Sequence, residues 1–292
     1  MAIQYSGGTI IHRTTTPSTR ADLTNFMTQA LSDAGWSTIS GTPGSGSDVT
    51  LESAAQSAGA KIRFRFVEPG SGNCMKVTMK HPLGSTAESQ AVFCLPSAGS
   101  GTWRIIANKF WFLAFATGGT NATAARGWVM GGTIHTPAFV NITSGDGLGW
   151  MHGAGSNDTD STTKIGFRRQ LRSTSSTCPF SGIYGSNLIE ITSVATGSVS
   201  IASWQAGPSN NDQGYRWEDN TLPVFEPLIS WGTGTSSANE SKIKGQLYDA
   251  VVLNGSWSSE AVLSLDGHTW MVITDTPTAN VSATNTLLVA IS

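Results

Sequence analysis

Charged residues are scarce in this sequence. Only 12% of its 292 residues are Asp, Glu, Lys or Arg, against about 25% in an ordinary soluble domain. The formal net charge of −2 provides no basic surface for DNA or RNA, so we expect no nucleic-acid partner. Polarity with so little charge would also suit a disordered chain, but 10 Trp and 11 Phe are present, and disordered chains mostly lack such residues. We therefore expect a folded protein.

Long apolar runs and targeting segments are missing as well. No run approaches the roughly 18 apolar residues of a membrane helix, and the longest candidate, residues 110–116, has the length of a strand. Residues 1–5 have neither the basic nor the apolar region of a secretion signal. The sequence therefore predicts a protein that is made in a cytoplasm and has no membrane partner.

Cysteine is rare, with Cys74, Cys94 and Cys178 as the three examples. No C-x-x-C pair occurs, which excludes the usual zinc-ribbon and thioredoxin-like spacings. We interpret the three thiols as buried or half-buried small apolar groups. A Cys74–Cys94 bridge is the alternative if neighbouring strands bring the two together, and it would matter only in an oxidising medium.

Small residues are abundant instead: the chain has 37 Ser, 35 Thr and 33 Gly. They cluster between short apolar segments, as turns do between strands. This pattern predicts a mainly β fold of antiparallel, sandwich-like sheets, with an α+β character only at the N-terminus.

Residues 19–34 carry the strongest helical pattern. Thr19 is a suitable N-cap, and Asp22 stands three residues later, as in a weaker form of the capping box. Gly35 follows, where a helix often ends in a left-handed residue. Apolar residues between these caps recur at the spacing of one helix face: Leu23, Phe26, Met27, Ala30, Leu31 and Ala34.

Two pairs of strands are predicted in the N-terminal half. Residues 61–67 and 75–80 alternate between apolar and polar, which indicates a half-buried antiparallel hairpin. Residues 103–108 and 110–116 are continuously apolar, which indicates strands that are covered on both faces.

The C-terminal half is predicted to be β-rich too. Residues 143–163 read as a long irregular segment, and residues 245–253 read as one strand. Further strands are predicted at 189–194, 199–204, 260–265, 268–273 and 287–291. Asp266 and Gly267 have the residue types of a two-residue hairpin turn.

We divide the chain into a helix-plus-sheet module at 1–135 and a β-rich module at 136–292, or else treat it as one continuous domain.

Motifs for catalysis or cofactors are absent. The five histidines never stand at metal-ligand spacing, and no G-x-S-x-G, P-loop or G-x-G-x-x-G occurs. We therefore predict that the protein is not an enzyme and has no cofactor. Asp158 and Asp160 are weak candidates for Ca²⁺, although they lack the fixed Gly and terminal Glu of an EF-hand loop, and a solvated turn explains them equally well.

Some residues are candidates for an interface between subunits. Trp150, Trp217 and Trp231 lie near Gly- or Asn-rich turns, where they would stack on a sugar or fill a subunit contact. Arg168 and Arg169 form a local basic cluster that suits ion pairing or assembly. Low charge supports the assembly interpretation, because interface cores are depleted in Lys, Glu and Asp.

The order of motifs resembles that of structural proteins of tailed-bacteriophage virions. The likeness covers about the first 135 and the last 50 residues, and it rests on a helix ending in Gly35-Trp36 and on segments 48–53, 103–112, 128–133, 244–252 and 266–270. It implies a subunit of the tail, baseplate or neck/collar, located in the virion, whose partners are copies of itself in a symmetric assembly and other virion proteins. It supplies no catalytic residues.

Two alternatives stay open at this point. One is a receptor- or carbohydrate-binding β module of the virion, such as a capsid decoration or a fibre-associated domain. The other is a glycan-cleaving enzyme, which needs two carboxylates converging in one cleft.

Overall fold

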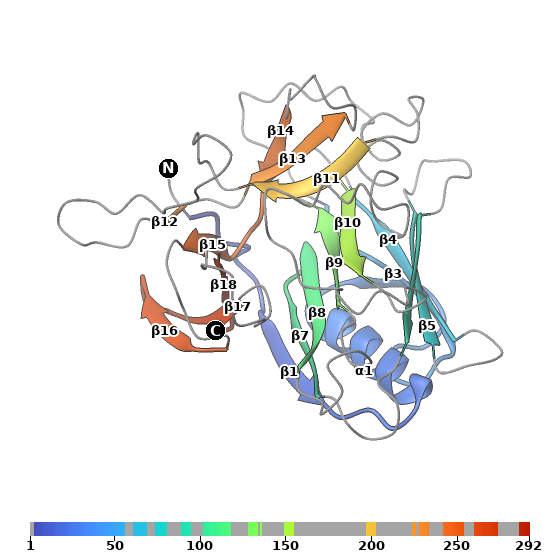
Figure 1. Ribbon diagram of the computed structural model, residues 1–292. Coiled ribbons are helices and arrows are strands. Elements are labelled where there is room, and N and C mark those ends of the chain that lie inside the picture. Colours follow the sequence, from blue (N-terminus) through green and yellow to red (C-terminus); the bar gives the residue numbers. More distant parts are fainter. Residues whose placement is uncertain are drawn as a thin grey trace, which may run out of the picture.

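The computed structural model describes one helix and 18 strands in the part of the chain whose placement is defined. That part comprises residues 3–55, 61–68, 74–80, 89–94, 102–117, 128–133, 135, 149–154, 197–202, 224–225, 228–233, 242–253, 260–273 and 286–292. All pairings between the strands are antiparallel, so the predicted mainly β fold is confirmed (Figure 1).

The strands form four sheets. The first contains, in spatial order, β1 (Ile11–Thr15), β7 (Thr102–Ala107), β8 (Trp111–Thr117), β9 (Trp128–Thr133) and β10 (Gly149–Ala154). The second contains β2 (Ser37–Ser40), β3 (Asp48–Glu52), β4 (Arg63–Val67), β5 (Cys74–Lys80) and β6 (Ser89–Cys94). The third contains β12 (Val224–Phe225), β15 (Ala250–Leu253), β18 (Thr286–Ala290), β17 (His268–Ile273) and β16 (Val262–Leu265). The fourth contains β11 (Gly197–Ala202), β13 (Leu228–Thr233) and β14 (Lys242–Gln246).

Helix α1 (Arg20–Asp33) starts and stops where the sequence predicts. The Oγ1 of Thr19 accepts a hydrogen bond from the Asp22 N–H at 3.1 Å, and the Asp22 carboxylate accepts one from the Thr19 N–H at 2.9 Å, completing a capping box. At the other end Gly35 has a φ of 97°. The backbone N–H of Trp36 then donates to the carbonyl of Leu31 at 3.0 Å, which is the Schellman pattern.

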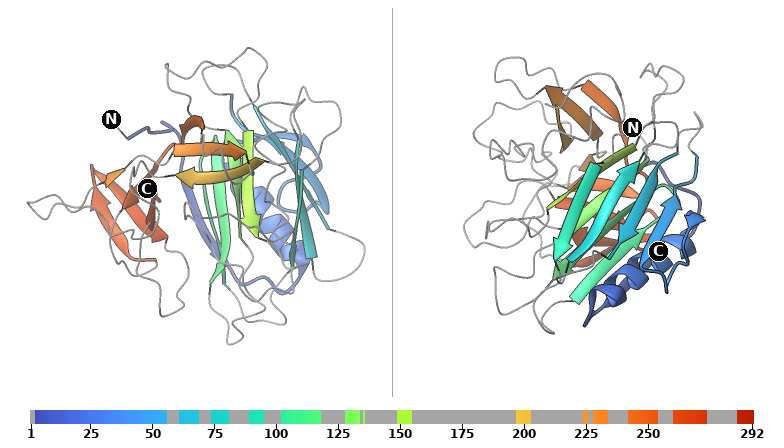
Figure 2. Two further views of the ribbon diagram at one scale, coloured as in Figure 1. Left: turned by 45° about the horizontal axis from the view of Figure 1, so that its top comes forward. Right: turned by 90° about the vertical axis from the view of Figure 1, so that its right-hand side faces the viewer.

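The main core lies between the first two sheets, and α1 contacts strands of both (Figures 1 and 2). Three aromatic rings join these layers: Trp36 follows the helix, Phe64 is on β4 and Phe112 is on β8. The ring centroids of Phe64 and Phe112 are 5.2 Å apart, and that of Trp36 is 5.7 Å from Phe64 and 5.8 Å from Phe112, all in edge-to-face geometry.

The predicted strand patterns agree with the observed burial. Phe64 and Phe66 of β4 are fully buried while Arg65 between them is exposed. Every residue from 111 to 115 in β8 is buried, so this strand is covered on both faces as expected. The hairpin turn between β16 and β17 is confirmed as well, because Asp266 and Gly267 have φ values of 51° and 75°.

Two sequence predictions are wrong. Residues 149–154, inside the segment predicted to be irregular, form β10, which pairs with β9; a partner strand distant in sequence specifies it, and its own sequence does not alternate. Residues 245–253 are divided between β14 and β15 in different sheets, with a bend at Asp249, whose φ is 53°. Long-range hydrogen bonds to Asp249 determine this bend. The strand predicted at 189–194 lies outside the described residues.

The main core also includes residues from both predicted modules. Leu247, Met271 and Val289 belong to the same buried cluster as residues of α1 and of the first two sheets. A smaller cluster on the other face of the third sheet contains Trp270 and Leu288. The division at residue 135 stays a prediction.

Candidate functional site

Few of the residues proposed from the sequence lie in the described part of the chain. Trp150 is in β10, at an edge of the first sheet, and Trp231 is in β13, the middle strand of the fourth sheet. The other candidates, Asp158, Asp160, Arg168, Arg169 and Trp217, lie outside the described residues. The two that are described therefore belong to different sheets, and the polar clusters of the described structure are built from other residues.

Asp249 is a buried carboxylate at the bend between β14 and β15, with 2% exposure. Its Oδ1 accepts a hydrogen bond from the backbone N–H of Ser6 at 2.8 Å, and its Oδ2 accepts one from Nδ2 of Asn108 at 2.7 Å. Its own N–H donates to the carbonyl of Gln4 at 2.7 Å. One side chain thereby joins the N-terminal segment, the turn between β7 and β8, and the bend.

Asn108 completes this cluster from the turn between β7 and β8. Its Oδ1 accepts hydrogen bonds from the backbone N–H groups of Phe110 at 2.8 Å and Trp111 at 3.0 Å. Its carbonyl accepts one from Nε1 of Trp36 at 2.8 Å, and Nε1 of Trp111 donates to the carbonyl of Tyr248 at 2.7 Å. Two N–H groups of this buried turn are thus satisfied by the side chain of Asn108 itself, and the Asn108 carbonyl is satisfied by the side chain of the distant Trp36.

The geometry around Asp249 is structural in character. The space between Ile10, Asn108, Trp111 and Asp249 has no room for a water molecule, and both carboxylate oxygens already accept hydrogen bonds. A general base needs contact with the proton that it abstracts, and this carboxylate has no space for a substrate. Burial and then the charge of Asp249 raise the pKa of the neighbouring Tyr248.

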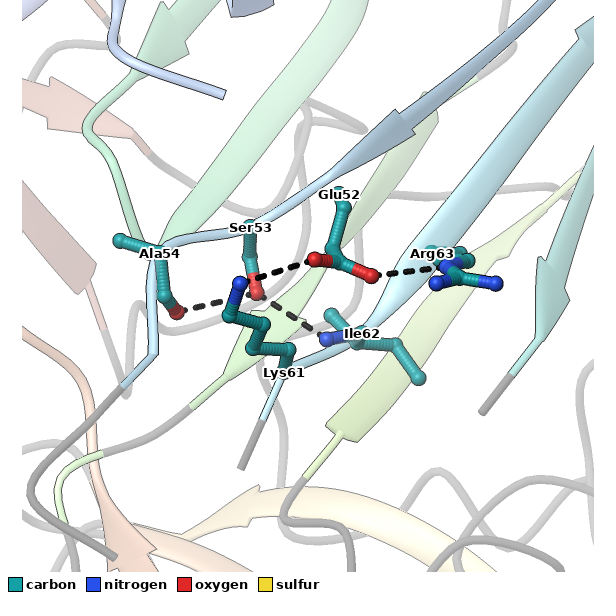
Figure 3. Close-up of polar contacts among 6 residues, drawn as sticks. All are labelled: Glu52, Ser53, Ala54, Lys61, Ile62 and Arg63. Carbon is teal, nitrogen blue, oxygen red and sulfur yellow. Dashed lines mark hydrogen bonds and ion pairs between the residues drawn. The ribbon is translucent and has the colours of Figure 1, made fainter. Parts of the chain in front are cut away.

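A second buried carboxylate, Glu52, lies at the end of β3 (Figure 3). Its Oε1 is 3.0 Å from Nζ of Lys61, and its Oε2 is 2.7 Å from Nε of Arg63. Burial raises the pKa of Glu52, but the hydrogen bonds from Arg63 and Lys61 and the charges of both outweigh it and lower the pKa. Next to it the hydroxyl of Ser53 accepts from the N–H of Ile62 at 3.1 Å. These contacts fasten β3 to the start of β4 and leave no free carboxylate oxygen for chemistry.

A third polar cluster joins β7 of the first sheet to the residues just before β16 of the third sheet. Nη2 of Arg104 is 2.5 Å from Oε2 of Glu260. His12 of β1 is close by, and its buried Nε2 has no hydrogen-bond partner within the described structure. Burial first, and then the positive charge of Arg104, lower the pKa of His12, against an opposing effect of Glu260. His12 is therefore harder to protonate than an ordinary histidine, beside an ion pair that joins two sheets.

The described residues contain neither a metal cluster nor a membrane-spanning helix. No group of three or more His, Cys, Asp or Glu side chains among them is arranged to hold a metal ion. The helix that they include, α1, is too short and too polar to cross a membrane.

The most exposed apolar feature of the described residues is the outer edge of the third sheet. Val262 in β16 is 56% exposed. The other exposed large apolar side chain among the described residues is Ile39 in β2, at 44%. The ladder of β2 is interrupted by a bulge at Ile39, and bulges protect edges from pairing. The pairing of β16 with β17 is regular from Val262 to Leu265. The β16 edge is therefore the better candidate for a contact.

Strand β16 lies at one side of the third sheet (Figure 1), and some of its backbone groups point away from β17. Thr269 of β17 uses both of its backbone groups on the far side, donating to the carbonyl of Ser292 at 3.0 Å and accepting from the N–H of Ile291 at 2.8 Å. Its register partner Ser264 therefore directs its N–H and C=O to the outer edge, and by alternation Val262 does the same. In the described ladders β16 has β17 as its one neighbour.

The sequence predicted the strand at 260–265 but did not indicate that it lies at an edge. The absence of charge from residues 262–265 was the available signal, and it suits a buried strand equally well. Asn108 and Asp249 were also missed, although each is a polar residue beside an apolar strand.

Comparisons of the chain with protein-family models, with curated proteins and with solved structures find no match.

Proposed function

We propose that this protein is an assembly subunit of a tailed-bacteriophage virion, in the tail, baseplate or neck/collar, and that its copies join through the β16 edge. The observation that carries the contact between copies is an exposed, uncharged edge strand whose outward backbone groups belong to Val262 and Ser264. The virion part of the proposal rests on the resemblance of the motif order to that of phage structural proteins. The low charge of the whole chain supports it, since 12% charged residues suit a surface that is covered by other subunits.

The composition of β16 is unusual for an edge that faces water. Proteins usually protect such edges with Lys, Pro, an inward-pointing charge or a bulge. The four residues of β16 are Val, Leu, Ser and Leu, and its ladder is regular. An edge without these features is suited to strand addition, in which a partner strand supplies the missing backbone hydrogen bonds.

A second copy of this chain is the occupant that we propose. Two identical strands pair antiparallel about a two-fold axis, and such self-complementary contacts are the commonest in homo-oligomers. Because the strand from Val262 to Leu265 carries no charge, pairing it with itself brings no like charges together within the strand. The neighbouring strand would cover part of the exposed Val262 side chain, which adds apolar burial to the new hydrogen bonds.

A proline substitution tests the contact specifically. The N–H of Ser264 points outward and takes no part in pairing with β17, so Ser264→Pro removes an outward donor and leaves the internal ladder intact. We expect the purified wild-type protein to be a dimer or larger in light scattering after gel filtration. Ser264→Pro should shift it to monomer, with a melting temperature within a few degrees of the wild type.

Ser264→Thr is the matched control, because it changes the same side chain, keeps the N–H and suits a strand; it should retain the oligomer. A wild-type monomer at high concentration, or a Ser264→Pro variant that stays oligomeric, would contradict the role of the β16 edge. Absence of the protein from purified particles, measured by mass spectrometry, would contradict the virion assignment independently.

A further inference from the structure

We propose that Cys74 and Cys94 are a thiol pair that forms a cross-strand disulfide when the protein meets an oxidising medium. The pairing of β5 with β6 places these two residues directly opposite each other in register. The chain contains three cysteines in all, and two of them occupy partner positions on neighbouring strands. This inference is independent of the proposed assembly role.

The separation of the two backbones suits such a bond. Directly opposite residues in an antiparallel ladder have Cα atoms about 5.5 Å apart in a hydrogen-bonded pair and about 4.5 Å apart in the other kind of pair. Disulfides are found with Cα separations of about 4.4–6.8 Å. Both kinds of pair therefore fall within the range, and the strands need no rearrangement to be joined.

The two positions lie on the outer face of the second sheet. Met75 and Val77 of β5 are fully buried in the core, so alternation along the strand assigns Cys74 to the opposite face. That face also carries Arg65 of β4, whose side chain is 48% exposed. The right-hand view of Figure 2 looks onto this sheet. Cys94, as the register partner of Cys74, is assigned to the same face.

The bond would join the open end of a hairpin. Cys74 is the first residue of β5 and Cys94 is the last residue of β6, so the chain connection between the strands lies at the other end. The ladder between the two strands ends at this pair. A covalent link there prevents the hairpin from opening and restricts the unfolded chain, which raises stability.

The reaction is ordinary thiol–disulfide exchange with a low-molecular-weight disulfide such as oxidised glutathione. One protein thiolate attacks a sulfur of oxidised glutathione, which forms a mixed disulfide and releases one glutathione thiolate. The second protein thiolate then attacks the protein sulfur of the mixed disulfide and releases the second glutathione thiolate. The two protein thiols lose two protons and two electrons, and oxidised glutathione is reduced to two molecules of glutathione.

The test is a peptide map of the folded full-length protein after incubation with oxidised glutathione. Free thiols are alkylated, the chain is digested with trypsin without reduction, and the peptides are identified by mass. We expect peptides 66–76 and 81–104, which contain Cys74 and Cys94, to be joined, while Cys178 is alkylated or carries glutathione. The melting temperature should rise by about 5 °C on oxidation.

Single variants separate the proposal from other outcomes. Cys74→Ser and Cys94→Ser should each abolish the joined peptides and the rise in melting temperature, while Cys178→Ser should keep both. The proposal is overturned if folded protein yields only glutathione adducts, links Cys178 to one of the pair, or joins Cys74 to Cys94 only after denaturation in urea.

Discussion

Two buried polar residues determine how distant parts of the chain meet. Asn108 and Asp249 are 3% and 2% exposed, and the hydrogen bond between them joins the β7–β8 turn to the bend before β15. Buried polar groups are costly unless each is paired. Both carboxylate oxygens of Asp249 and the Oδ1 of Asn108 accept hydrogen bonds. Groups that would destabilise the core if they were left unpaired therefore specify one arrangement of it.

Asn108→Ala should destabilise the protein by about 3 kcal/mol. The substitution leaves the N–H groups of Phe110 and Trp111 without their acceptor and removes a donor to the buried Asp249 carboxylate. Asn25→Ala is the matched control, because Oδ1 of Asn25 is buried without a hydrogen bond and Ala is the better helix residue. Urea unfolding should show a large loss for the first variant and little or none for the second; equal losses would contradict the role of Asn108.

Residue-scale predictions from the sequence succeed where the partner is local. Thr19, Asp22 and Gly35 act within one helix, and their residue types indicated their roles. Asn108 and Asp249 are 141 positions apart, and neither residue type indicates such a partner. The same limit explains why residues 245–253 were predicted to be one strand.

Elements are positioned by close backbone approach as well as by side chains. Gly132 in β9 has a φ of 146°, and a Cβ there would overlap the carbonyl oxygen of Phe110 and lie 2.5 Å from the Cα of Trp111. This approach allows the β8–β9 ladder to continue beside the Asn108 turn. Gly267, in the β16–β17 turn, also has a positive φ, 75°, but a Cβ added there would have no other atom within 4 Å.

The two glycines give a matched pair of Gly→Ala variants. Gly267→Ala should cost about 1–2 kcal/mol, the strain of a left-handed conformation alone. Gly132→Ala should cost about 3 kcal/mol or more, because the backbone of the neighbouring strand has to move. Denaturant unfolding of both variants measures the difference, and a Gly132→Ala variant as stable as Gly267→Ala would show that the two strands are less closely held than described.

At this scale the sequence predicted the helix and the two hairpins, because their signals are periodic and close in sequence. It missed β10, which has no alternation and is specified by β9, and it did not identify β16 as an edge. Sheet neighbours depend on the whole fold, and no local pattern encodes them.

Across the whole molecule, titratable groups set limits on stability at both ends of the pH scale. On the acid side Glu52 and Asp48 have lowered pKa values. At Glu52 burial raises the pKa, but the hydrogen bonds from Arg63 and Lys61 outweigh the effect of burial. At Asp48 the hydrogen bond from Arg65 lowers the pKa. Their stabilisation is complete above about pH 5 and is lost as the pH falls through their unfolded and then their folded pKa values. The lowered pKa of His12 adds a loss as the pH falls below about 6.5.

At alkaline pH, two tyrosines with raised pKa values limit the stability of the folded protein. Burial, the hydrogen bond to Asp266 and the charges of Asp266 and Asp249 raise the pKa of Tyr5 from 10.0 to about 12, and burial raises that of Tyr248. The folded protein therefore holds phenolic protons that the unfolded chain releases above about pH 10. This stabilisation is complete below about pH 10 and is lost as the pH rises toward about 12.

Tyr5→Phe should therefore reduce the loss of stability between about pH 10 and 12. At about pH 8 the variant should be slightly less stable, because the 2.7 Å hydrogen bond from the Tyr5 hydroxyl to Asp266 is removed while the ring still stacks on His268. The measurement is the urea midpoint from about pH 3 to 11.5, with Glu52→Gln as the control, which should change the acid side and leave the alkaline side as in the wild type. If Tyr5→Phe loses stability at alkaline pH as steeply as the wild type, the Tyr5 hydroxyl does not bind Asp266 in solution. The contact between residues 3–6 and the third sheet would then not be maintained either.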